Sequence, residues 1–559
     1  MSKIESTQNS AENRLGSWRN LTLREQVAQT VILHVSQDVL PFGDIETFIK
    51  RYPVGGIFVG GEVIEDGSNG LDSVKASVDA CQNASKIPML VSADLENGCG
   101  DVIPGLTPLP WPMALGAAND PELANRYGRA CAREGSLAGI NWALAPMADL
   151  NLHPLSSNVG TRAFGDDADR VVPLLQAFVD GMQAEGMAAC AKTFPGDGSD
   201  YRDQHLTTTM NQLSQDDWMM SYGKVFKTLI DRGVATIMTG HICAPGFQSA
   251  KERTPDGRYI PCTFSHELTT DLLKEKLGFE GVVVSDAFGM GGVLSHLSLE
   301  EACVEAFKAG VDMLLWPGVE YIDRMVALIE SGEVPFSRLH DALERIWNAK
   351  KLYAVEGIVL RDSQKVIEEA EAVASDTAKS ALTLLWNRCN TLPLSPENEK
   401  RLLILAATPN DKAYERMKIM QGELQSRGFS VDIKRNVFPE ELKELAVNYD
   451  RILVLVERQF HRPLGTMDLF GEDARNFWSC SCAGWDKLVA IGLGSPYLVP
   501  WYFPQAKAAI NAYSAAPLVQ KIVAAGLCGE IDFPGSDPVK IECRFGVKDL
   551  SDYKRGDFC

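Results

Sequence analysis

Short apolar runs alternate with amphipathic segments from residue 30 to about residue 320. Continuous apolar runs are typical of parallel strands that are buried on both faces. Between them, apolar residues at helical spacing predict helices, for example over 121–137, 170–185, 214–232 and 299–309. Eight such strand–helix units favour a (β/α)8 TIM-type barrel over an open sheet. The predicted strands are 31–35, 56–59, 89–93, 142–146, 188–193, 235–240, 281–285 and 312–316.

A second alternation follows the barrel. Residues 336–385 have a helical pattern, and the next segment, with Pro393 and Pro396, is rich in turn residues. This order of elements is typical of a smaller, doubly wound α/β sandwich domain. Its predicted strands are 402–406, 430–433, 452–456 and 488–491, and its predicted helices are 411–427, 439–447 and 515–525. We therefore divide the chain into a barrel (1–335), a helical linker region (336–390) and a C-terminal α/β sandwich (391–559).

Composition narrows the classes of partner. The chain of 559 residues carries 54 basic and 74 acidic side chains, for a formal net charge of −20. Such a protein lacks the basic surface that nucleic acid requires, so nucleic acid is excluded as the main partner. No apolar run approaches the roughly 18 residues that span a bilayer. Residues 1–20 also lack the apolar stretch of a secretory signal, so the sequence predicts a soluble, cytoplasmic protein without membrane contact.

The thirteen cysteines do not form a metal or redox motif. They are odd in number and scattered, and Cys480 and Cys482 are the only close pair. No Cys-x-x-Cys spacing or histidine cluster accompanies them, so neither a metal nor a cofactor is predicted. We expect the cysteines to be reduced and mostly buried, as in a cytosolic protein.

Polar side chains follow five consecutive predicted strands of the barrel, from the third to the seventh. In a (β/α)8 barrel the loops after the strands meet at one end, and active sites lie there. Loops are polar in general, but five polar strand ends at the same end of one barrel predict a site that grips several hydroxyl groups. The side chains concerned are Asp94, Glu96, Asp149, Arg162, Lys192, His205, His241 and Asp286.

Two of these positions have the chemistry of a catalytic pair. Asp286 follows the apolar run 282–284, so a rigid strand would hold its carboxylate as a nucleophile. Asp203 and His205 are two residues apart, so in an extended segment both side chains point the same way. Asp203 would then bind one imidazole nitrogen and leave the other for proton transfer near neutral pH. The alternatives are a structural or capping role for Asp286 and an exposed loop position for His205.

The order of several motifs resembles glycoside hydrolase family 3. The barrel motifs are GGIFV, SADLENG, GTRAFG, KTFPGDG followed by DQH, IMTGHI and VVVSDAFGM. Within the family they are most similar to the β-N-acetylglucosaminidase branch. The segments TLLWNRCNTLPL, VAIGLGSPYLV and CGEIDFPGSDPV also resemble the second domain of that family, so the resemblance covers nearly the whole chain.

The resemblance implies a retaining, two-step β-N-acetylglucosaminidase that acts on cell-wall or chitin fragments. Asp286 matches the family nucleophile, which forms a glycosyl–enzyme intermediate. His205, oriented by Asp203, matches the acid/base of a mobile loop and replaces the second carboxylate that most glycosidases use. The family's sugar-binding positions fall on Asp94, Arg162, Lys192 and His241.

The chain departs from the family pattern in two motifs. The family sequence Lys-His-Phe-Pro-Gly-His-Gly has Thr193 and Asp197 here at the two histidine positions. The family sequence Asp-x-Glu-Gly-Gly has Asn97 here at its first glycine. Thr193 replaces a sugar-contacting imidazole by a short hydroxyl, so at this substrate-binding position we expect a larger pocket or a shifted specificity.

Three other functions remain open from the sequence. An imidazole acid/base does not repel an incoming anion as a carboxylate would, so inorganic phosphate can replace water in a phosphorylase. A family 3 β-glucosidase is the second alternative, although such enzymes generally take a carboxylate acid/base from elsewhere in the chain. A non-catalytic sugar-binding protein is the third, and only Thr193 favours it. The oligomeric state is left open.

Overall fold

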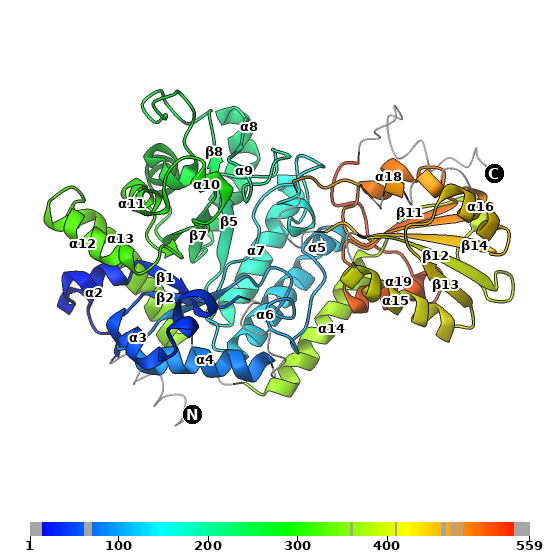
Figure 1. Cartoon of the computed structure of the whole chain (residues 1–559), viewed down its shortest axis with the longest axis horizontal. Coiled ribbons are helices and arrows are strands. Elements are labelled where there is room, and N and C mark those ends of the chain that lie inside the picture. The colour runs from blue at the N-terminus through cyan, green and yellow to red at the C-terminus, as the bar shows by residue number, and fades with distance from the viewer. Residues whose placement is uncertain are drawn as a thin grey trace.

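Figure 1 shows the computed structural model of the chain, in which a large barrel domain is joined to a smaller sandwich domain. The structure describes residues 14–60, 70–357, 361–408, 411–459, 465–469, 471, 474–475, 478–480 and 485–541. Two sequence-based interpretations, on the N-terminal segment 1–13 and on Cys482, therefore lie outside the described residues.

Eight strands line the barrel, one at each position predicted from the apolar runs. Several of them, including β1, β3 and β9, are buried along their whole length, which explains why their sequences are largely apolar without alternation. The strands are β1 (Val31–His34), β2 (Gly56–Phe58), β3 (Leu90–Ala93), β4 (Trp142–Ala143), β5 (Cys190–Phe194), β7 (Thr236–Thr239), β9 (Val282–Ser285) and β10 (Leu314–Leu315).

These strands close into a ring through two parallel sheets. Hydrogen bonds order five strands as β10-β1-β2-β3-β4 and three as β5-β7-β9. Isolated parallel bridges join the two sheets: Trp142 of β4 pairs with Ala188 just before β5, and Val284 of β9 pairs with Met313 just before β10. The prediction of a (β/α)8 barrel is confirmed.

A further pair of short strands ties two loops together at the C-terminal end of the barrel. β6 (Thr209–Met210) pairs in parallel with β8 (Ile242–Cys243). β6 ends the long loop after β5, and β8 follows β7 almost directly. The pairing therefore holds the loop of Asp203 and His205 beside the strand end that carries His241.

Helices cover the outside of the barrel (Figure 1). α6 (Pro121–Leu137) and α11 (Leu299–Ala309) have the predicted bounds, and α7 (Ala168–Ala184) is close to them. The helix predicted over 214–232 is divided into α8 (Gln215–Met220) and α9 (Tyr222–Asp231), because Ser221 leaves the helical region at φ −113° and ψ −96°. The other helices of this domain are α2 (Leu23–Ala28), α3 (Ile45–Arg51), α4 (Gly70–Ala84), α5 (Met113–Ala118), the π-helix Glu267–Lys276, α10 (Gly291–Leu294), α12 (Glu320–Glu330) and α13 (Phe336–Ala349).

The C-terminal domain is built on a six-stranded sheet in the order β11-β16-β15-β14-β12-β13. Only β11 and β16 pair in antiparallel fashion among the described strands of this sheet. The sequence predicted a helix through residue 385 and no strand at 508–511, and both predictions are wrong, because these two segments pair with each other. The strands are β11 (Thr383–Asn387), β12 (Arg401–Ala407), β13 (Ser430–Lys434), β14 (Arg451–Val456), β15 (Leu488–Gly492) and β16 (Ala508–Asn511).

Helices lie on both faces of this sheet, as a doubly wound domain requires (Figure 1). α15 (Asp411–Ser426) and α19 (Pro517–Leu527) pack on one face, in one apolar core. α16 (Pro439–Ala446) and α18 (Leu498–Tyr502) pack on the other, in a second core. α14 (Ser363–Ala381) contacts both α6 of the barrel and α19, so it joins the two domains.

The C-terminal domain contacts the barrel at segments that follow β3 and β4. Met113 of α5 belongs to the same apolar core as Tyr497 of the C-terminal domain. Asn151 donates through its side-chain amide to the Tyr497 hydroxyl at 3.2 Å. The Met467 N–H donates to the carbonyl of Leu155 at 3.0 Å. The second domain thus borders the end of the barrel where the sequence places the active site.

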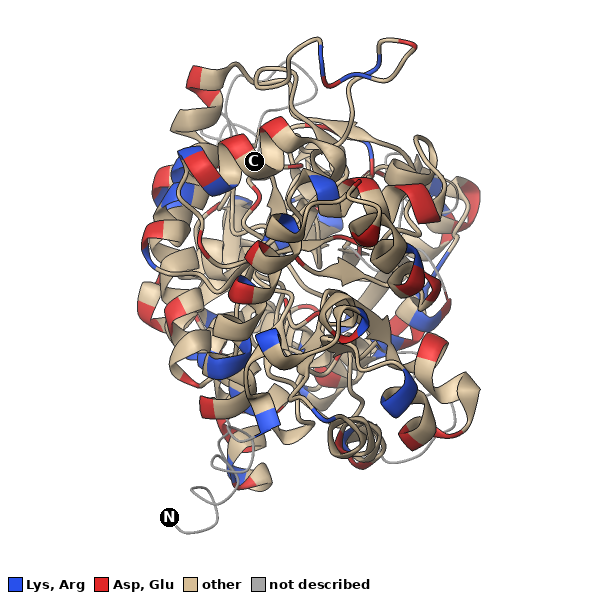
Figure 2. Ribbon diagram, turned by 90° about the vertical axis from the view of Figure 1, so that its left-hand side faces the viewer, with Lys and Arg blue, Asp and Glu red and all other residues tan. Residues whose placement is uncertain are grey.

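The distribution of surface charge, the length of the helices and the state of the cysteines can be compared with the sequence-based predictions. Acidic and basic residues are interspersed over the face shown in Figure 2. None of the described helices is long and apolar enough to cross a membrane. Nine of the cysteines in the described ranges are free, and eight of these are buried. Cys389 is disulfide-bonded, so the prediction of reduced cysteines is wrong at this position.

Candidate active site

A cluster of charged side chains lies at the C-terminal ends of β3, β4 and β5. Lys192 of β5 donates to Oδ1 of Asp94 at 2.7 Å and lies 2.6 Å from Oε1 of Glu96. Arg162 grips the same Glu96 carboxylate through Nε and Nη2, both at 2.7 Å. The side chains of Lys192, Glu96 and Arg162 are less than 10% exposed, whereas that of Asp94 is 50% exposed. Asp94 is therefore the member of the cluster that is open to a ligand.

Opposite charges keep this cluster ionised in spite of its burial. Burial alone would raise the pKa of Glu96, but Arg162 and Lys192 hold it at about 2. Burial would lower the pKa of Arg162, but Glu96, Asp94 and Asp286 raise it. Burial would also lower the pKa of Lys192, but Asp94 and Glu96 raise it. The site thus offers fixed charges for the hydroxyl and carbonyl groups of a sugar.

Glu96→Gln is expected to lower both stability and sugar affinity. The amide keeps the shape of the side chain but removes the charge that Arg162 and Lys192 share, and breaking such a buried pair costs about 3–5 kcal/mol of unfolding free energy. Urea unfolding and KM for an aryl glycoside measure the two effects. The matched control is Glu46→Gln, which breaks the exposed Lys50–Glu46 pair of α3 and is expected to cost less than about 1 kcal/mol. Equal, small losses in both variants would contradict the assignment.

Asp286 is held at the end of β9, next to the charged cluster. Its backbone N–H donates to the Thr239 carbonyl of β7 at 3.0 Å. Its Oδ1 accepts a hydrogen bond from the Ala287 N–H at 2.8 Å, and the residue is half-buried. Its negative charge acts on both Arg162 and His241. A carboxylate fixed in this way and still accessible has the properties of a nucleophile.

Asp203 and His205 are paired, as the sequence predicts. Nδ1 of His205 lies 2.7 Å from Oδ1 of Asp203, which also accepts the His205 backbone N–H at 2.9 Å. The N–H groups of Leu206 and Thr207 donate to the Asp203 carbonyl, so the pair forms in a tight turn and not in the extended segment that the sequence suggested. Burial would raise the pKa of Asp203, but the hydrogen bond and charge of His205 lower it, so Asp203 stays a carboxylate.

The turn that carries His205 rests on the loop that follows Asp286. The Gly291 N–H donates to the His205 carbonyl at 2.8 Å. A Cβ atom on Gly291 would lie 2.3 Å from the Leu206 carbonyl oxygen, so this close approach requires glycine. The two loops that carry the predicted catalytic residues are therefore in direct contact.

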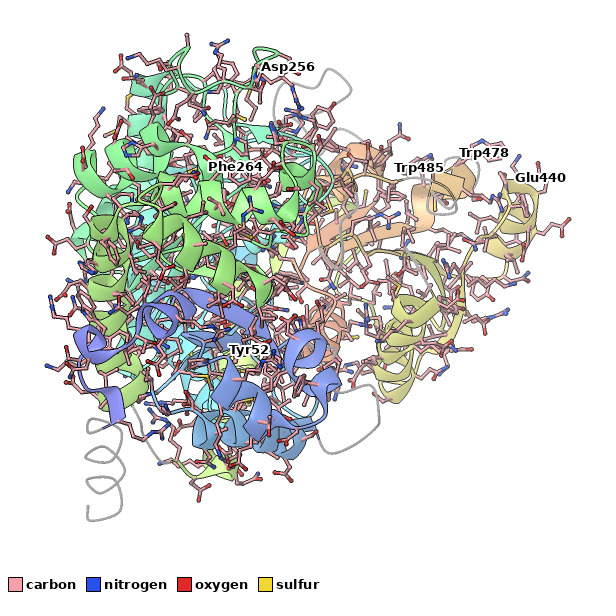
Figure 3. All side chains as sticks on the ribbon, turned by 60° about the vertical axis from the view of Figure 1, so that its left-hand side comes forward. Tyr52, Asp256, Phe264, Glu440, Trp478 and Trp485 are labelled. Atoms are coloured by element: carbon pink, nitrogen blue, oxygen red, sulfur yellow. The ribbon has the colours of Figure 1, made fainter. Side chains whose placement is uncertain are left out.

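His241 lies under the site, where both of its ring nitrogens have protein partners. Nδ1 is 2.9 Å from Oγ1 of Thr263, and Nε2 donates to the Ala287 carbonyl at 3.0 Å. Thr263 precedes Phe264, which Figure 3 labels on the barrel domain. Burial lowers the pKa of His241 although the charge of Asp286 opposes this shift. A neutral His241 thus supports the loop after Asp286, and the charges of Asp286 and His205 both act on its ring.

Thr193 also lies beneath the site. Its hydroxyl donates to Oδ2 of Asp149 at 2.8 Å, and its backbone N–H donates to the same oxygen at 3.0 Å. Its side chain is buried. The hydroxyl is therefore used by a buried carboxylate, and the structure does not bring Thr193 together with the open part of the site.

Sequence reasoning counted Glu96 only among the polar strand-end residues, with no specific role, and did not single out Asn158. Glu96 is the shared partner of Arg162 and Lys192, and the signal for it was its place two residues after Asp94 at a strand end. Asn158 accepts from Nη1 of Arg162 with its backbone carbonyl and with Oδ1, both at 2.8 Å. No local signal marks Asn158, because it lies in an irregular loop far from any predicted strand.

The sequence matches the family model "Glycosyl hydrolase family 3 N terminal domain" over residues 22–349, more than half of the chain. The chain belongs to glycosyl hydrolase family 3. The matched region of this family 3 chain contains the barrel and all the charged residues described above. Among its described residues, no group of three or more His, Cys, Asp or Glu side chains is placed to hold a metal ion.

Sequence relatives and solved structures match the family 3 chain over all or part of its length. A "Beta-N-acetylglucosaminidase/beta-glucosidase" of Cellulomonas fimi is 29% identical over 513 residues, which cover 88% of this chain and 90% of that protein. A "Beta-hexosaminidase" of Chromobacterium violaceum is 29% identical over 309 residues, 53% of this chain and 79% of the relative. The solved structure of "Beta-glucoside phosphorylase BglX" has a TM-score of 0.82 at 26% identity and covers 98% of this chain and 97% of its own. A family 3 β-N-acetylglucosaminidase from Paenibacillus sp. str. FPU-7 shares the fold, with a TM-score of 0.80 at 24% identity over 93% of this chain and 99% of its own.

Proposed function

We propose that this family 3 chain is a retaining β-N-acetylglucosaminidase that releases N-acetylglucosamine from β-glycosides of cell-wall or chitin fragments. The observation that carries the proposal is the contact between two loops, one with Asp286 and the other with His205 paired to Asp203 at 2.7 Å. The names of the relatives, β-N-acetylglucosaminidase and β-hexosaminidase, support this choice of substrate class.

In the first step, Asp286 attacks the anomeric carbon of the bound sugar. A bond forms between a carboxylate oxygen and that carbon while the glycosidic C–O bond breaks. His205 donates a proton from Nε2 to the departing oxygen, and Asp203, bound to Nδ1, fixes the ring and stabilises its charged form before the transfer. The products of this step are the free alcohol and the glycosyl–enzyme.

In the second step, water takes the place of the departed alcohol. His205 accepts a proton from water while the water oxygen bonds to the anomeric carbon. At the same time the bond between this carbon and the Asp286 carboxylate breaks. Two displacements at one carbon restore the original β-configuration. Asp286 returns as a carboxylate and His205 regains its proton, so both groups are ready for the next cycle.

We assign sugar binding to Asp94, Lys192 and Arg162. The exposed carboxylate of Asp94 is suited to accept hydrogen bonds from hydroxyl groups remote from the reacting carbon. Lys192 and Arg162, held by Glu96, provide positive charge toward hydroxyl and N-acetyl oxygens.

The choice of sugar is tested by product analysis on an aryl N-acetylglucosaminide and an aryl glucoside, with Asp286→Ala as the blank. We expect the N-acetylglucosaminide to be cleaved with a β-configured first product. Cleavage of the glucoside alone would replace the proposal by a β-glucosidase. Clear sugar binding without cleavage of either compound would favour a non-catalytic sugar-binding protein.

Phosphorolysis is the second candidate function, and two observations favour it. The acid/base is an imidazole, which does not repel an incoming phosphate after the first step. The structure named "Beta-glucoside phosphorylase BglX" matches nearly the whole chain. The same aryl substrates are therefore turned over with and without inorganic phosphate. A faster rate with a sugar 1-phosphate product would establish phosphate as the acceptor, and no gain in rate without that product would leave water in this role.

The cellular location is also proposed to be the cytoplasm. The eight buried, free cysteines support this location, whereas the disulfide bond at Cys389 speaks against it. Fractionation of cells that express the full chain distinguishes the cytoplasm from an oxidising compartment outside it.

The oligomeric state is determined by sedimentation of the same protein.

A further inference from the structure

Two carboxyl groups lie side by side beneath the sugar-binding cluster, and the proposed chemistry uses neither. Asp149 and Asp197 are both fully buried. Oδ1 of Asp149 accepts the backbone N–H of Asp197 at 2.8 Å, and Oδ2 accepts both donors of Thr193. Thr193 and Asp197 are the two positions at which this chain departs from the Lys-His-Phe-Pro-Gly-His-Gly pattern. Both departures therefore meet at Asp149.

The two oxygens of Asp197 have different surroundings. Oδ2 accepts a hydrogen bond from Nδ2 of Asn158 at 2.7 Å. Oδ1 is buried without a well-formed hydrogen bond, and the buried hydroxyl of Thr209, also without one, is the group next to this carboxyl. A proton on Oδ1 lets it donate to the Thr209 hydroxyl, whereas an ionised carboxylate leaves a buried negative charge with only neutral partners.

The charges that face the pair also favour one retained proton. Asp200 and Asp149 both repel a charge on Asp197, and the buried phenol of Tyr222 lies close to both carboxyls. Arg162 attracts a charge on Asp149, but its guanidinium is already paired with Glu96. Burial raises the pKa of Asp149 to about 6, and burial together with the charge of Asp149 raises the pKa of Asp197 to about 8. At neutral pH the pair therefore holds one proton.

Asn158 connects this pair to the sugar-binding cluster. Its side-chain amide donates to Asp197, and its Oδ1 accepts from Nη1 of Arg162 at 2.8 Å. The orientation of the Asn158 amide is therefore determined at both ends. The preceding residue, Ser157, donates to Oδ2 of Asp203 at 3.4 Å, so the same loop also reaches the proposed acid/base.

We propose that Asp149 and Asp197 share one proton and that the protonated pair, through Asn158, positions Arg162 for sugar binding. Asp197 is thus a positioning residue of this enzyme and has no direct contact with the sugar. When the shared proton leaves at alkaline pH, two buried negative charges repel each other, the loop after β5 shifts, and Asn158 no longer holds Arg162. The inference rests on the proposed role of Arg162.

The test compares Asp197→Asn with Asp197→Ala in steady-state kinetics from pH 5.5 to pH 9.5. Asparagine has the shape of a protonated aspartic acid and cannot ionise. For the wild type we expect KM for an aryl glycoside to rise by about tenfold between pH 7 and pH 9.5, because one charged hydrogen bond to the sugar is lost. Asp197→Asn is expected to keep the neutral KM and to lose this rise. Asp197→Ala is expected to show a raised KM at every pH.

Two kinetic results would overturn the proposal. One is an unchanged alkaline rise of KM in Asp197→Asn, and the other is a wild-type KM for Asp197→Ala. Asp216→Asn, at an exposed position of α8, is the matched control and is expected to keep the wild-type profile. KM is the decisive quantity, because proton transfer through His205 affects kcat. Thermal unfolding at pH 7 shows which variants are folded.

An infrared measurement tests the shared proton without any turnover. A protonated carboxyl group absorbs at a frequency that a carboxylate does not share. Burial raises the pKa of Glu134 to about 7, so this carboxyl adds its own band in every variant. We therefore expect a difference spectrum of the wild type minus Asp197→Asn at pH 7 to show the band, and its absence from the difference spectrum would overturn the proposal. If no aryl glycoside is cleaved but the band is present, the proposed function is wrong, while the proposal that the two carboxyl groups share a proton still holds.

Discussion

Asp286→Ala is expected to reduce kcat for an aryl β-N-acetylglucosaminide by about four orders of magnitude or more. The reason is that no other carboxylate lies at the end of β9, where the strand and the Ala287 N–H hold the attacking group. The variant is expected to keep its fold, because Asp286 is half-buried and forms no ion pair with any side chain in the described part of the chain. A small anion such as azide fits the space left by the carboxylate. It is expected to restore turnover and to give a product of α-configuration.

The matched control is Asp256→Ala, which alters an exposed aspartate of the barrel domain labelled in Figure 3. Its ion pair with Arg258 lies at the surface, so kcat is expected to stay at the wild-type value. A comparable loss in both variants would show that the effect of Asp286→Ala is not specific. Retention of activity in Asp286→Ala would move the nucleophile to another residue.

The second large effect is expected for His205→Ala, and its size depends on the leaving group. Removal of a general acid costs about 10²–10⁴-fold when the departing oxygen needs a proton. Substrates with a poor leaving group, such as a disaccharide, therefore lose most activity, whereas an activated nitrophenyl glycoside loses little in the first step. The measurement is kcat/KM over a series of aryl glycosides whose phenol leaving groups differ in pKa. The plot of log kcat/KM against this pKa is expected to be steeper for the variant than for the wild type.

His266→Ala provides the control, because His266 is exposed and also forms an ion pair with an aspartate, Asp271. It is expected to leave the leaving-group series unchanged. Asp203→Asn should fall between wild type and His205→Ala, because the amide no longer stabilises the imidazolium. Equal losses for good and poor leaving groups in His205→Ala would show that His205 is not the acid/base.

The barrel strands were predictable because their burial is local in sequence. A parallel strand covered on both faces is largely apolar, as the run 282–284 of β9 is, so the run itself indicates the element. β11 was missed for the opposite reason. It follows a long helix without a break, and it becomes a strand only because β16, more than a hundred residues later, pairs with it.

The charged positions of the site were predictable for a topological reason. All parallel strands of a closed barrel end on the same side, so Asp94, Lys192 and Asp286 had to lie near one another. Which of the strand-end side chains already have protein partners was not predictable. Thr193 and His241 stand at strand ends too, but partners 44 and 46 residues away, Asp149 and Ala287, occupy their polar atoms.

The sequence by itself determined the (β/α)8 barrel with its second α/β domain, the family, and the pairing of Asp203 with His205. These features depend on apolar periodicity, motif order and contacts between near neighbours. Only the tertiary structure decided that Glu96 joins Arg162 to Lys192, and that Asp197 meets Asp149 and Asn158 beneath them. The physical reason is that buried charges and polar atoms must find partners wherever the fold brings them, and those partners come from loops that no local pattern connects.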